Sequence, residues 1–116
     1  MNYYSKLIGT GSGFPENVVT NADLEKFVDT SDEWIRTRTG IETRRLADPA
    51  KGESTLTFAE SAARQAMKMA EIAGSEIEMI VVGTVTPDTL MPNTANQLQA
   101  LLGANQAFTF DLQAAC

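Results

Sequence analysis

The apolar positions recur with helical spacing in one long stretch and with strand-like spacing in two shorter ones. Residues 54–74 place small apolar side chains three and four positions apart, which predicts a long helix with one mostly alanine face. The unalternating run 79–84 predicts a strand buried on both faces. Residues 107–112 alternate, which predicts a second strand with Phe108, Phe110 and Leu112 on one side. Between these strands we expect a loop over 84–93 and a helix that begins at Asn93 or Thr94 and stops at Gly103. This helix should turn Ala95, Leu98 and Leu102 inward.

The first half of the chain has shorter patterns. Residues 6–13 predict a strand that runs into a glycine-rich loop, 41–46 an extended segment and 48–53 a loop. Thr20 precedes Asp23 by three positions, as in a capping box, so we expect a short helix over 22–28. A second helix should start with Thr30 as its cap and Glu33 reaching back, and should end near Gly40.

Helices that alternate with strands predict an α/β fold with right-handed crossovers and a mostly parallel sheet. We find no internal repeat, low-complexity stretch or interdomain linker in the 116 residues. The length suits one domain with a modest core.

The composition then excludes several classes of function. Nine basic residues against 15 acidic ones give a net charge of −6, which argues against nucleic acid or an anionic membrane surface as the main partner. The start of the chain lacks the apolar region of a signal peptide, and a single cysteine fits a reducing cytoplasm. The absence of histidine removes the commonest metal ligand and general base, so no metal site is expected.

Three features carry candidate chemistry, each with a structural alternative. Gly9, Gly11 and Gly13 resemble a phosphate loop, but their spacing misses the dinucleotide fingerprint, so we favour a structural exit from a strand. Trp34 and Arg38 lie four positions apart and would share a helix face suited to an adenine nucleotide or phosphopantetheine.

The alternative for that face is a solvated helix, with Trp34 half buried and arginine paired to Asp32 or Glu33. The third feature is Cys116, which follows the strand over 108–112 and would suit a nucleophile at the carboxyl edge of a sheet. Its alternative is a buried small hydrophobic residue.

Four segments together resemble one known family. They read Gly-Thr-Gly-Ser-Gly-Phe-Pro at 9–15, Val-Thr-Asn-Ala-Asp-Leu-Glu at 19–25, Asp-Thr-Ser-Asp-Glu-Trp-Ile-Arg-Thr-Arg-Thr-Gly-Ile at 29–41 and Phe-Asp-Leu-Gln-Ala-Ala-Cys at 110–116. The chain resembles the N-terminal third of a beta-ketoacyl-acyl-carrier-protein synthase III. The resemblance runs over essentially all of residues 1–116 and favours the functional readings of the tryptophan, the arginine and the cysteine.

The resemblance implies a thiolase-like fold, with five αβαβα layers in the complete protein, of which residues 1–116 would be the N-terminal part of the first half. It implies a cytoplasmic homodimer that condenses an acyl-CoA, typically acetyl-CoA, with malonyl-acyl carrier protein to start fatty acid synthesis. Cys116 would be the nucleophile, while Thr30, Trp34 and Arg38 would contact CoA. Met91 would close the partner's acyl pocket. No cofactor is implied, because the CoA thioester is a substrate.

The family's catalytic His and Asn have no counterpart here, because the family chain is roughly three times longer. We therefore expect the rest of the polypeptide to follow Cys116, and residues 1–116 alone to be inactive. Two alternatives stay open: a related condensing enzyme of secondary metabolism, and a short non-catalytic CoA-binding module.

Overall fold

The structure is a computed structural model that describes residues 4–114. These residues form two compact units, one made of 14–53 and the other of 4–13 with 54–114. Each unit is described by itself. Cys116 lies outside the described residues.

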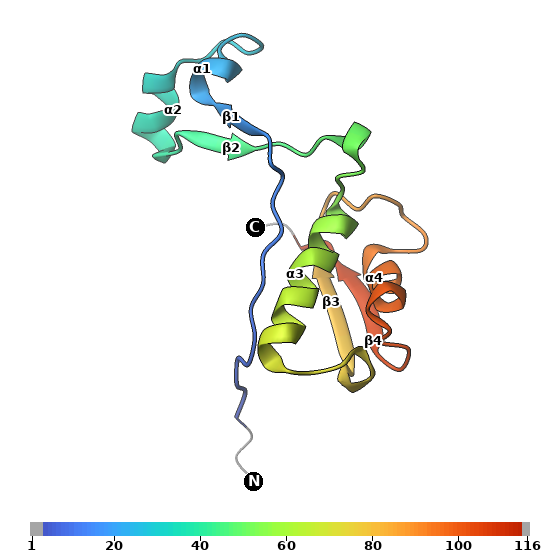
Figure 1. Cartoon of the computed structure of the whole chain (residues 1–116). Helices are drawn as coiled ribbons and strands as arrows, with labels where there is room; N and C mark the ends of the chain where they lie inside the picture. The colour runs from blue at the N-terminus through green and yellow to red at the C-terminus, as the bar shows by residue number, and fades with distance from the viewer. Residues whose placement is uncertain (1–3, 115–116) are drawn as a thin grey trace. The chain divides into compact units, whose positions relative to one another are not determined.

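The unit 14–53 is built on a small antiparallel ribbon, with β1 at Val18–Thr20 paired to β2 at Thr43–Arg45 (Figure 1). The first helix, α1, spans Asn21–Leu24, and its cap is the predicted capping box of Thr20 and Asp23. It is shorter than the predicted 22–28, because its last residues continue only as turns. A 3-10 turn, η1 at Pro49–Lys51, lies within the predicted loop.

The second helix of this unit, α2, spans Asp32–Thr39 and ends at Gly40, which adopts φ 72° as its left-handed cap. The predicted cap was wrong by one residue. Ser31, not Thr30, accepts the hydrogen bond from Trp34 N–H at 3.1 Å. The Glu33 side chain was expected to bond back to the start of the helix. A carboxylate from outside the helix takes this part instead, because Glu25 Oε1 accepts a hydrogen bond from Asp32 N–H at 2.7 Å.

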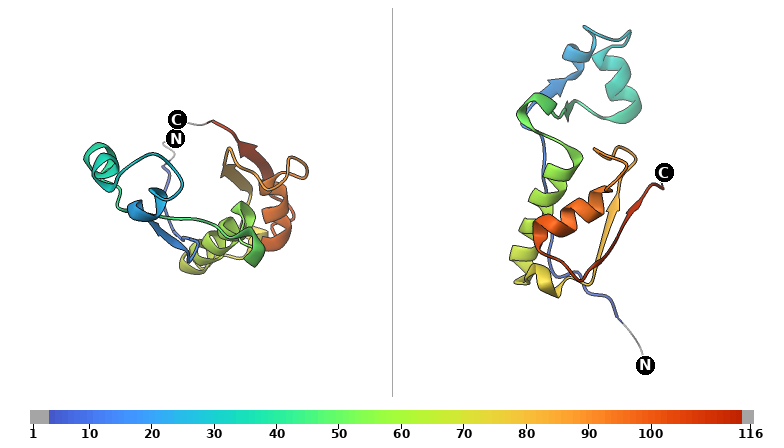
Figure 2. Two further views of the ribbon diagram at one scale, coloured as in Figure 1. Left: turned by 90° about the horizontal axis from the view of Figure 1, so that it is seen from above. Right: turned by 90° about the vertical axis from the view of Figure 1, so that its right-hand side faces the viewer.

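The larger unit holds one β-α-β arrangement preceded by a long helix. Its elements are α3 at Thr55–Ala70, η2 at Gly74–Glu76, β3 at Met79–Gly83, α4 at Thr94–Leu102 and β4 at Phe108–Leu112. The strands β3 and β4 pair in parallel, as predicted, from Met79 opposite Phe108 to Gly83 opposite Leu112. Both helices lie on the same side of this two-stranded sheet (Figure 2).

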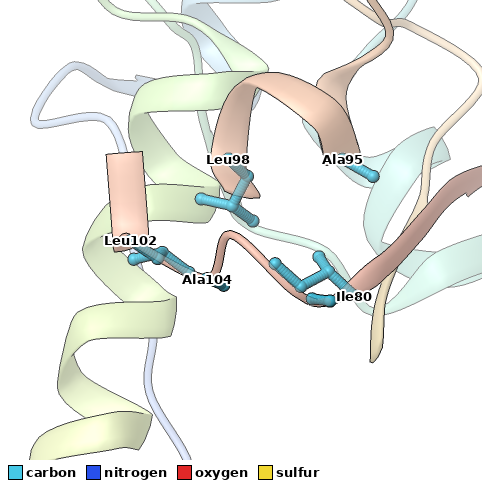
Figure 3. Packing of buried hydrophobic residues seen from close by; sticks show 6 residues of the cluster. Ile80, Ala95, Leu98, Leu102 and Ala104 are labelled. Atoms are coloured by element: carbon cyan, nitrogen blue, oxygen red, sulfur yellow. The ribbon is translucent and has the colours of Figure 1, made fainter. Parts of the chain in front are cut away.

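The core of the larger unit lies between that side of the sheet and the helices. Figure 3 shows its buried side chains, which are Ile80, Ala95, Leu98, Leu102, Ala104 and Ala107. The three predicted inward positions of α4 all belong to it. Apolar residues of α3 pack around the cluster, as its alanine-rich face predicted.

The expectation that β3 is buried on both faces was wrong for the described chain. Ile80 is buried, but its neighbours Met79 and Val81 are 58% and 46% exposed. The other strand shows the same face open, with Phe108 64% and Leu112 51% exposed. The helices cover only one side of the sheet, so the continuous apolar run of β3 has one covered and one uncovered face.

The glycine-rich segment was predicted to leave a strand, but no strand is assigned within residues 6–13. This segment instead runs along α3 (Figure 1). A Cβ at Gly9, Gly11 or Gly13 would come closer than 3.0 Å to a backbone carbonyl oxygen of α3. These glycines therefore permit close backbone packing, which is the structural reading of the motif.

The long helix also ends earlier than predicted. Its C-cap is Glu71, with φ 56° in the left-handed region, and the backbone N–H of Glu71 donates to Lys68 O. Gly74 begins η2 instead, where a Cβ would meet the carbonyl oxygen of Leu102. The glycine is needed there for close packing and not for a helix stop.

Candidate functional site

The exposed face of α2 brings the tryptophan and arginine singled out in the sequence into direct contact. The guanidinium carbon of Arg38 lies 5.0 Å from the centroid of the Trp34 ring. This is the geometry of a cation–π contact, and it follows from the four-residue spacing on a helix. Trp34 remains 54% exposed, so much of its surface is open to a ligand.

Thr30 joins this group at the start of the helix. An open depression of about 340 Å³ is lined by Asp29, Thr30, Ser31 and Trp34. Because Ser31 supplies the helix cap, Thr30 is not required for capping. The three predicted CoA-binding residues are thus neighbours on one surface of the unit 14–53.

The two arginines of α2, Arg36 and Arg38, have different partners. Arg36 pairs with Asp32 at 3.5 Å and with Glu42 at 3.1 Å, as the solvated-helix alternative described. Arg38 has no ion pair with a carboxylate within residues 4–114, and its charge lies over the indole instead. Arg38 therefore keeps a positive charge that is free to meet an anionic group.

This arrangement has a definite chemical capacity. An exposed indole can stack on a base, and a neighbouring guanidinium can bind a phosphate through parallel N–H donors. The hydroxyl of Thr30 adds one donor and acceptor beside them. Such a set is suited to a ligand with an aromatic base and phosphates, such as an adenine nucleotide.

A second candidate region is the carboxyl edge of the sheet in the larger unit. Gly83 lies opposite Leu112 at the ends of the parallel strands, and Thr84 N–H donates to Leu112 O at 3.2 Å. The loop that carries Met91 and the segment that leads to Cys116 both leave from this edge. Active sites of open α/β sheets form at such edges. The role of Cys116 stays a prediction.

The loop over 84–93 is held at its base and open at its tip. Leu90 and Met91 are 85% and 89% exposed. Behind them, Gln97 Nε2 donates to Thr89 Oγ1 at 2.9 Å and to Pro92 O at 3.0 Å. The loop thus presents two apolar side chains from an anchored frame, and the predicted acyl-pocket role of Met91 remains untested.

Two carboxylates anchor this region, and the sequence reading missed both. Asp111 accepts from the N–H groups of Thr94 and Ala95 at 2.9 and 2.8 Å, so it joins β4 to the start of α4. Asp88 accepts from the N–H groups at the start of α3, 2.8 Å from Leu56 N and 3.1 Å from Thr55 N. A lone acidic residue within an apolar strand was the signal that could have found Asp111.

Asp88 also has a shifted pKa. Loss of hydration raises it, but hydrogen bonds from Leu56 N–H, the Ser54 side chain and Thr55 N–H outweigh that effect. The pKa of Asp88 therefore lies below its ordinary value, since these donors favour the charged form.

The third missed residue is Asn21, the first residue of α1, which is only 1% exposed. Its amide connects three separate elements of the unit 14–53. A buried amide directly after a capping threonine has the same local pattern as an ordinary polar residue of a first helical turn, so no sequence signal could have identified it.

Two further properties concern the described part of the chain. Residues 4–114 contain no group of three or more metal-ligating side chains placed to hold an ion. No helix among them has the length and apolarity needed to cross a membrane.

Comparison with known proteins decides what this chain is similar to. No family model matches it. A beta-ketoacyl-[acyl-carrier-protein] synthase III of Xylella fastidiosa is 51% identical over 113 residues, which cover 97% of this chain and 34% of the relative. Over nearly its whole length, the chain is similar to beta-ketoacyl-acyl-carrier-protein synthase III. It spans about a third of the length of the curated relatives it matches.

Solved structures agree with this similarity. A 3-oxoacyl-[acyl-carrier-protein] synthase III from Aquifex aeolicus superposes with a TM-score of 0.89 at 48% identity, over 96% of this chain and 35% of that one. A priming beta-ketosynthase of the R1128 polyketide pathway has the same TM-score at 37% identity, over 96% of this chain and 33% of that one. The fold is that of part of a thiolase-like synthase III, as the sequence resemblance implied.

Proposed function

We propose that residues 1–116 form part of a beta-ketoacyl-acyl-carrier-protein synthase III that starts fatty acid synthesis. The complete enzyme would condense an acyl-CoA, most simply acetyl-CoA, with malonyl-acyl carrier protein to give a 3-oxoacyl-acyl carrier protein. The observation that carries the proposal is the surface formed by Thr30, Trp34 and Arg38, on a chain so similar to these synthases. It supports recognition of the nucleotide end of CoA.

The reaction we propose has two stages. The Cys116 thiolate attacks the thioester carbonyl of acyl-CoA, the C–S bond to CoA breaks, and CoA leaves as a thiolate that takes a proton from water. The malonyl group on the carrier protein then loses carbon dioxide. Its carbanion attacks the acyl-cysteine carbonyl and releases the Cys116 thiolate.

Both stages place negative charge on an oxygen, which needs preorganised donors. This chain contains no histidine. We propose that groups beyond residues 1–116 stabilise the enolate and that residues 1–116 alone do not turn over.

We assign the CoA subsites by their chemistry. Trp34 would stack on adenine, Arg38 would bind a phosphate, and Thr30 would hydrogen-bond beside them. The activated thioester is itself the substrate, so the proposal includes no separate cofactor. We propose that the complete enzyme is a cytoplasmic homodimer in which Met91 contacts the acyl pocket of the second subunit. The high exposure of Met91 at the loop tip supports this contact.

A related condensing enzyme of polyketide synthesis is the second candidate. It is favoured by the similarity to the R1128 priming beta-ketosynthase, although the identity is lower, 37% against 48%. The acceptor separates the two. Preferred use of malonyl-acyl carrier protein of fatty acid synthesis supports the first proposal, and preferred use of malonyl-CoA supports the second.

The direct test labels the full-length protein with radioactive acetyl-CoA. One acetyl group should appear on the peptide that contains Cys116. Cys116→Ser should abolish condensation, because a serine hydroxyl is far less ionised than a thiol of lowered pKa. Label found only elsewhere, or full activity of the serine variant, would refute the assignment. Binding of acetyl-CoA without any covalent label or condensation would instead support a non-catalytic CoA-binding module.

The CoA surface has its own test. Trp34→Ala should raise KM for acetyl-CoA about tenfold, since a base–aromatic stack is worth about 1–3 kcal/mol. Phe27→Ala is the matched control, because Phe27 is an aromatic residue of the same unit that is 82% exposed. An unchanged KM in a folded Trp34→Ala enzyme would remove Trp34 from the site.

A further inference from the structure

The unit 14–53 contains one buried amide that holds the helix bearing Trp34. Asn21 Nδ2 donates to Asp32 Oδ1 and to Ile41 O, each at 2.8 Å. Asn21 Oδ1 accepts from Arg44 Nη2 at 2.6 Å. Asp32 is the first residue of α2, and Ile41 follows its cap, Gly40. One side chain therefore ties both ends of α2 to β2.

The amide group is required for this pattern. Its NH2 group donates to Asp32 on α2 and to the carbonyl of Ile41 just after the helix. Its oxygen accepts from the guanidinium of Arg44 on β2. A carboxylate would keep only the arginine contact and would face Asp32 with a like charge. An aliphatic residue would leave Asp32, Arg44 and the carbonyl of Ile41 without these partners.

The helix has little apolar packing that could replace the amide. Ile35 is its one buried residue within the described chain. The backbone N–H of Asn21 donates to Glu42 O at 3.3 Å. Two exposed side-chain contacts also restrain the helix: the bond from Asp32 N–H to Glu25 and the ion pair of Arg36 with Glu42. Exposed ion pairs stabilise little. The orientation of α2 therefore depends mainly on Asn21.

We infer that Asn21 is a positioning residue for acyl-CoA binding, which acts by fixing α2 and hence the stacked pair of Trp34 and Arg38. The inference rests on the proposed function, because it takes that pair as the nucleotide subsite. Loss of the amide leaves the reacting groups unchanged but lets the platform move. Acyl-CoA binding weakens, while the chemistry of the bound thioester stays the same.

The test compares two acetyl donors in the full-length protein. Acetyl-CoA carries the nucleotide that would reach Trp34, and acetyl-pantetheine does not. Asn21→Asp should raise KM for acetyl-CoA about tenfold, the effect of leaving buried partners unsatisfied. It should leave kcat and the KM for acetyl-pantetheine unchanged. A merely structural defect would impair both donors together.

A second substitution tests the contact itself. Asn21→Asp combined with Asp32→Asn restores a donor and an acceptor facing each other, with the arginine still opposite the carboxylate. This pair should bring the KM for acetyl-CoA partway back, because the 21–32 contact is restored while Ile41 O still has no donor. Asn105→Asp makes the same chemical change at an exposed loop position and should have no effect. Asn21→Ser removes the amide without adding charge, so it carries the test if the aspartate variant does not fold.

The outcomes distinguish the inference from the proposed function. If Trp34→Ala leaves KM for acetyl-CoA unchanged, the nucleotide subsite itself is wrong. If Trp34→Ala raises KM but the folded Asn21 variants do not, the subsite stands and the positioning role is overturned. Equal losses with acetyl-CoA and acetyl-pantetheine, or no recovery in the paired variant, also overturn it.

Discussion

Different forces stabilise the two units of this chain. The larger unit buries a cluster of apolar side chains between its helices and one face of its sheet. In the unit 14–53, the described residues bury one isoleucine, Ile35, and one amide, Asn21. The first is stabilised by removal of apolar surface from water, and the second depends on hydrogen bonds and helix caps. The candidate binding surface of the chain thus lies in the unit 14–53, whose structure depends on individual hydrogen bonds.

This difference has a consequence for how substitutions act. Apolar burial is shared among many contacts, so a change in the larger unit should lower its stability without abolishing its arrangement. A directed contact has few substitutes. A change at one cap or amide of the unit 14–53 should therefore alter a local orientation more than the global stability.

The largest effect is expected in the apolar core. Leu98 is 5% exposed and belongs to the buried cluster, so Leu98→Ala should cost about 2–5 kcal/mol of unfolding free energy. Leu101, on the same helix, is 43% exposed, and Leu101→Ala should cost about 1 kcal/mol or less. Urea denaturation of the full-length protein measures both. Equal losses at the two positions would contradict a core formed by this helix face.

The glycine segment should give the next largest effect. A Cβ at Gly11 would meet the carbonyl oxygen of Ala62 closer than 3.0 Å, so Gly11→Ala should destabilise by about 1–3 kcal/mol through overpacking. Gly83→Ala is the matched control, since no atom lies within 4 Å of a Cβ there. Thermal unfolding compares the two. A neutral Gly11→Ala would show that the segment does not pack closely on α3.

A smaller effect separates the two candidates for the cap of α2. Ser31→Ala removes the acceptor for Trp34 N–H and should cost about 1 kcal/mol of local stability. Thr30→Ala keeps that cap, so it should leave the helix intact and weaken only acetyl-CoA binding. Amide hydrogen exchange at Trp34 reports the first effect, and KM reports the second. Faster exchange in the threonine variant alone would restore Thr30 as the cap.

The pattern of apolar residues predicted the larger unit well and the smaller one less well. The spacing of Ala95, Leu98 and Leu102 identified the buried face of α4, because a helix period is repeated over several turns. The cap of α2 was misplaced by one residue, because Thr30 and Ser31 have the same chemistry and only the backbone decides between them.

Contacts between distant residues were beyond the sequence alone. Asn21, Asp88 and Asp111 each bond to groups far along the chain, and no local spacing encodes such a partner. The open face of β3 was also unpredictable. An apolar run indicates that a strand can be covered on both sides, but it does not identify what covers each side. For the candidate site, the spacing of Trp34 and Arg38 sufficed because both lie on one helix.

The smallest effect concerns the pH dependence of the larger unit. The pKa of Asp88 is lowered in the folded chain, so its charged form stabilises the fold above its ordinary value of 3.8. That contribution is lost as the pH falls through the lowered pKa. Asp88→Asn should therefore destabilise α3 modestly at pH 7 and flatten the loss of stability below about pH 4. Amide exchange and circular dichroism across an acid titration measure this, with Asp29→Asn in the other unit as the control. An unchanged acid profile would show that the carboxylate of Asp88 does not cap α3 in solution.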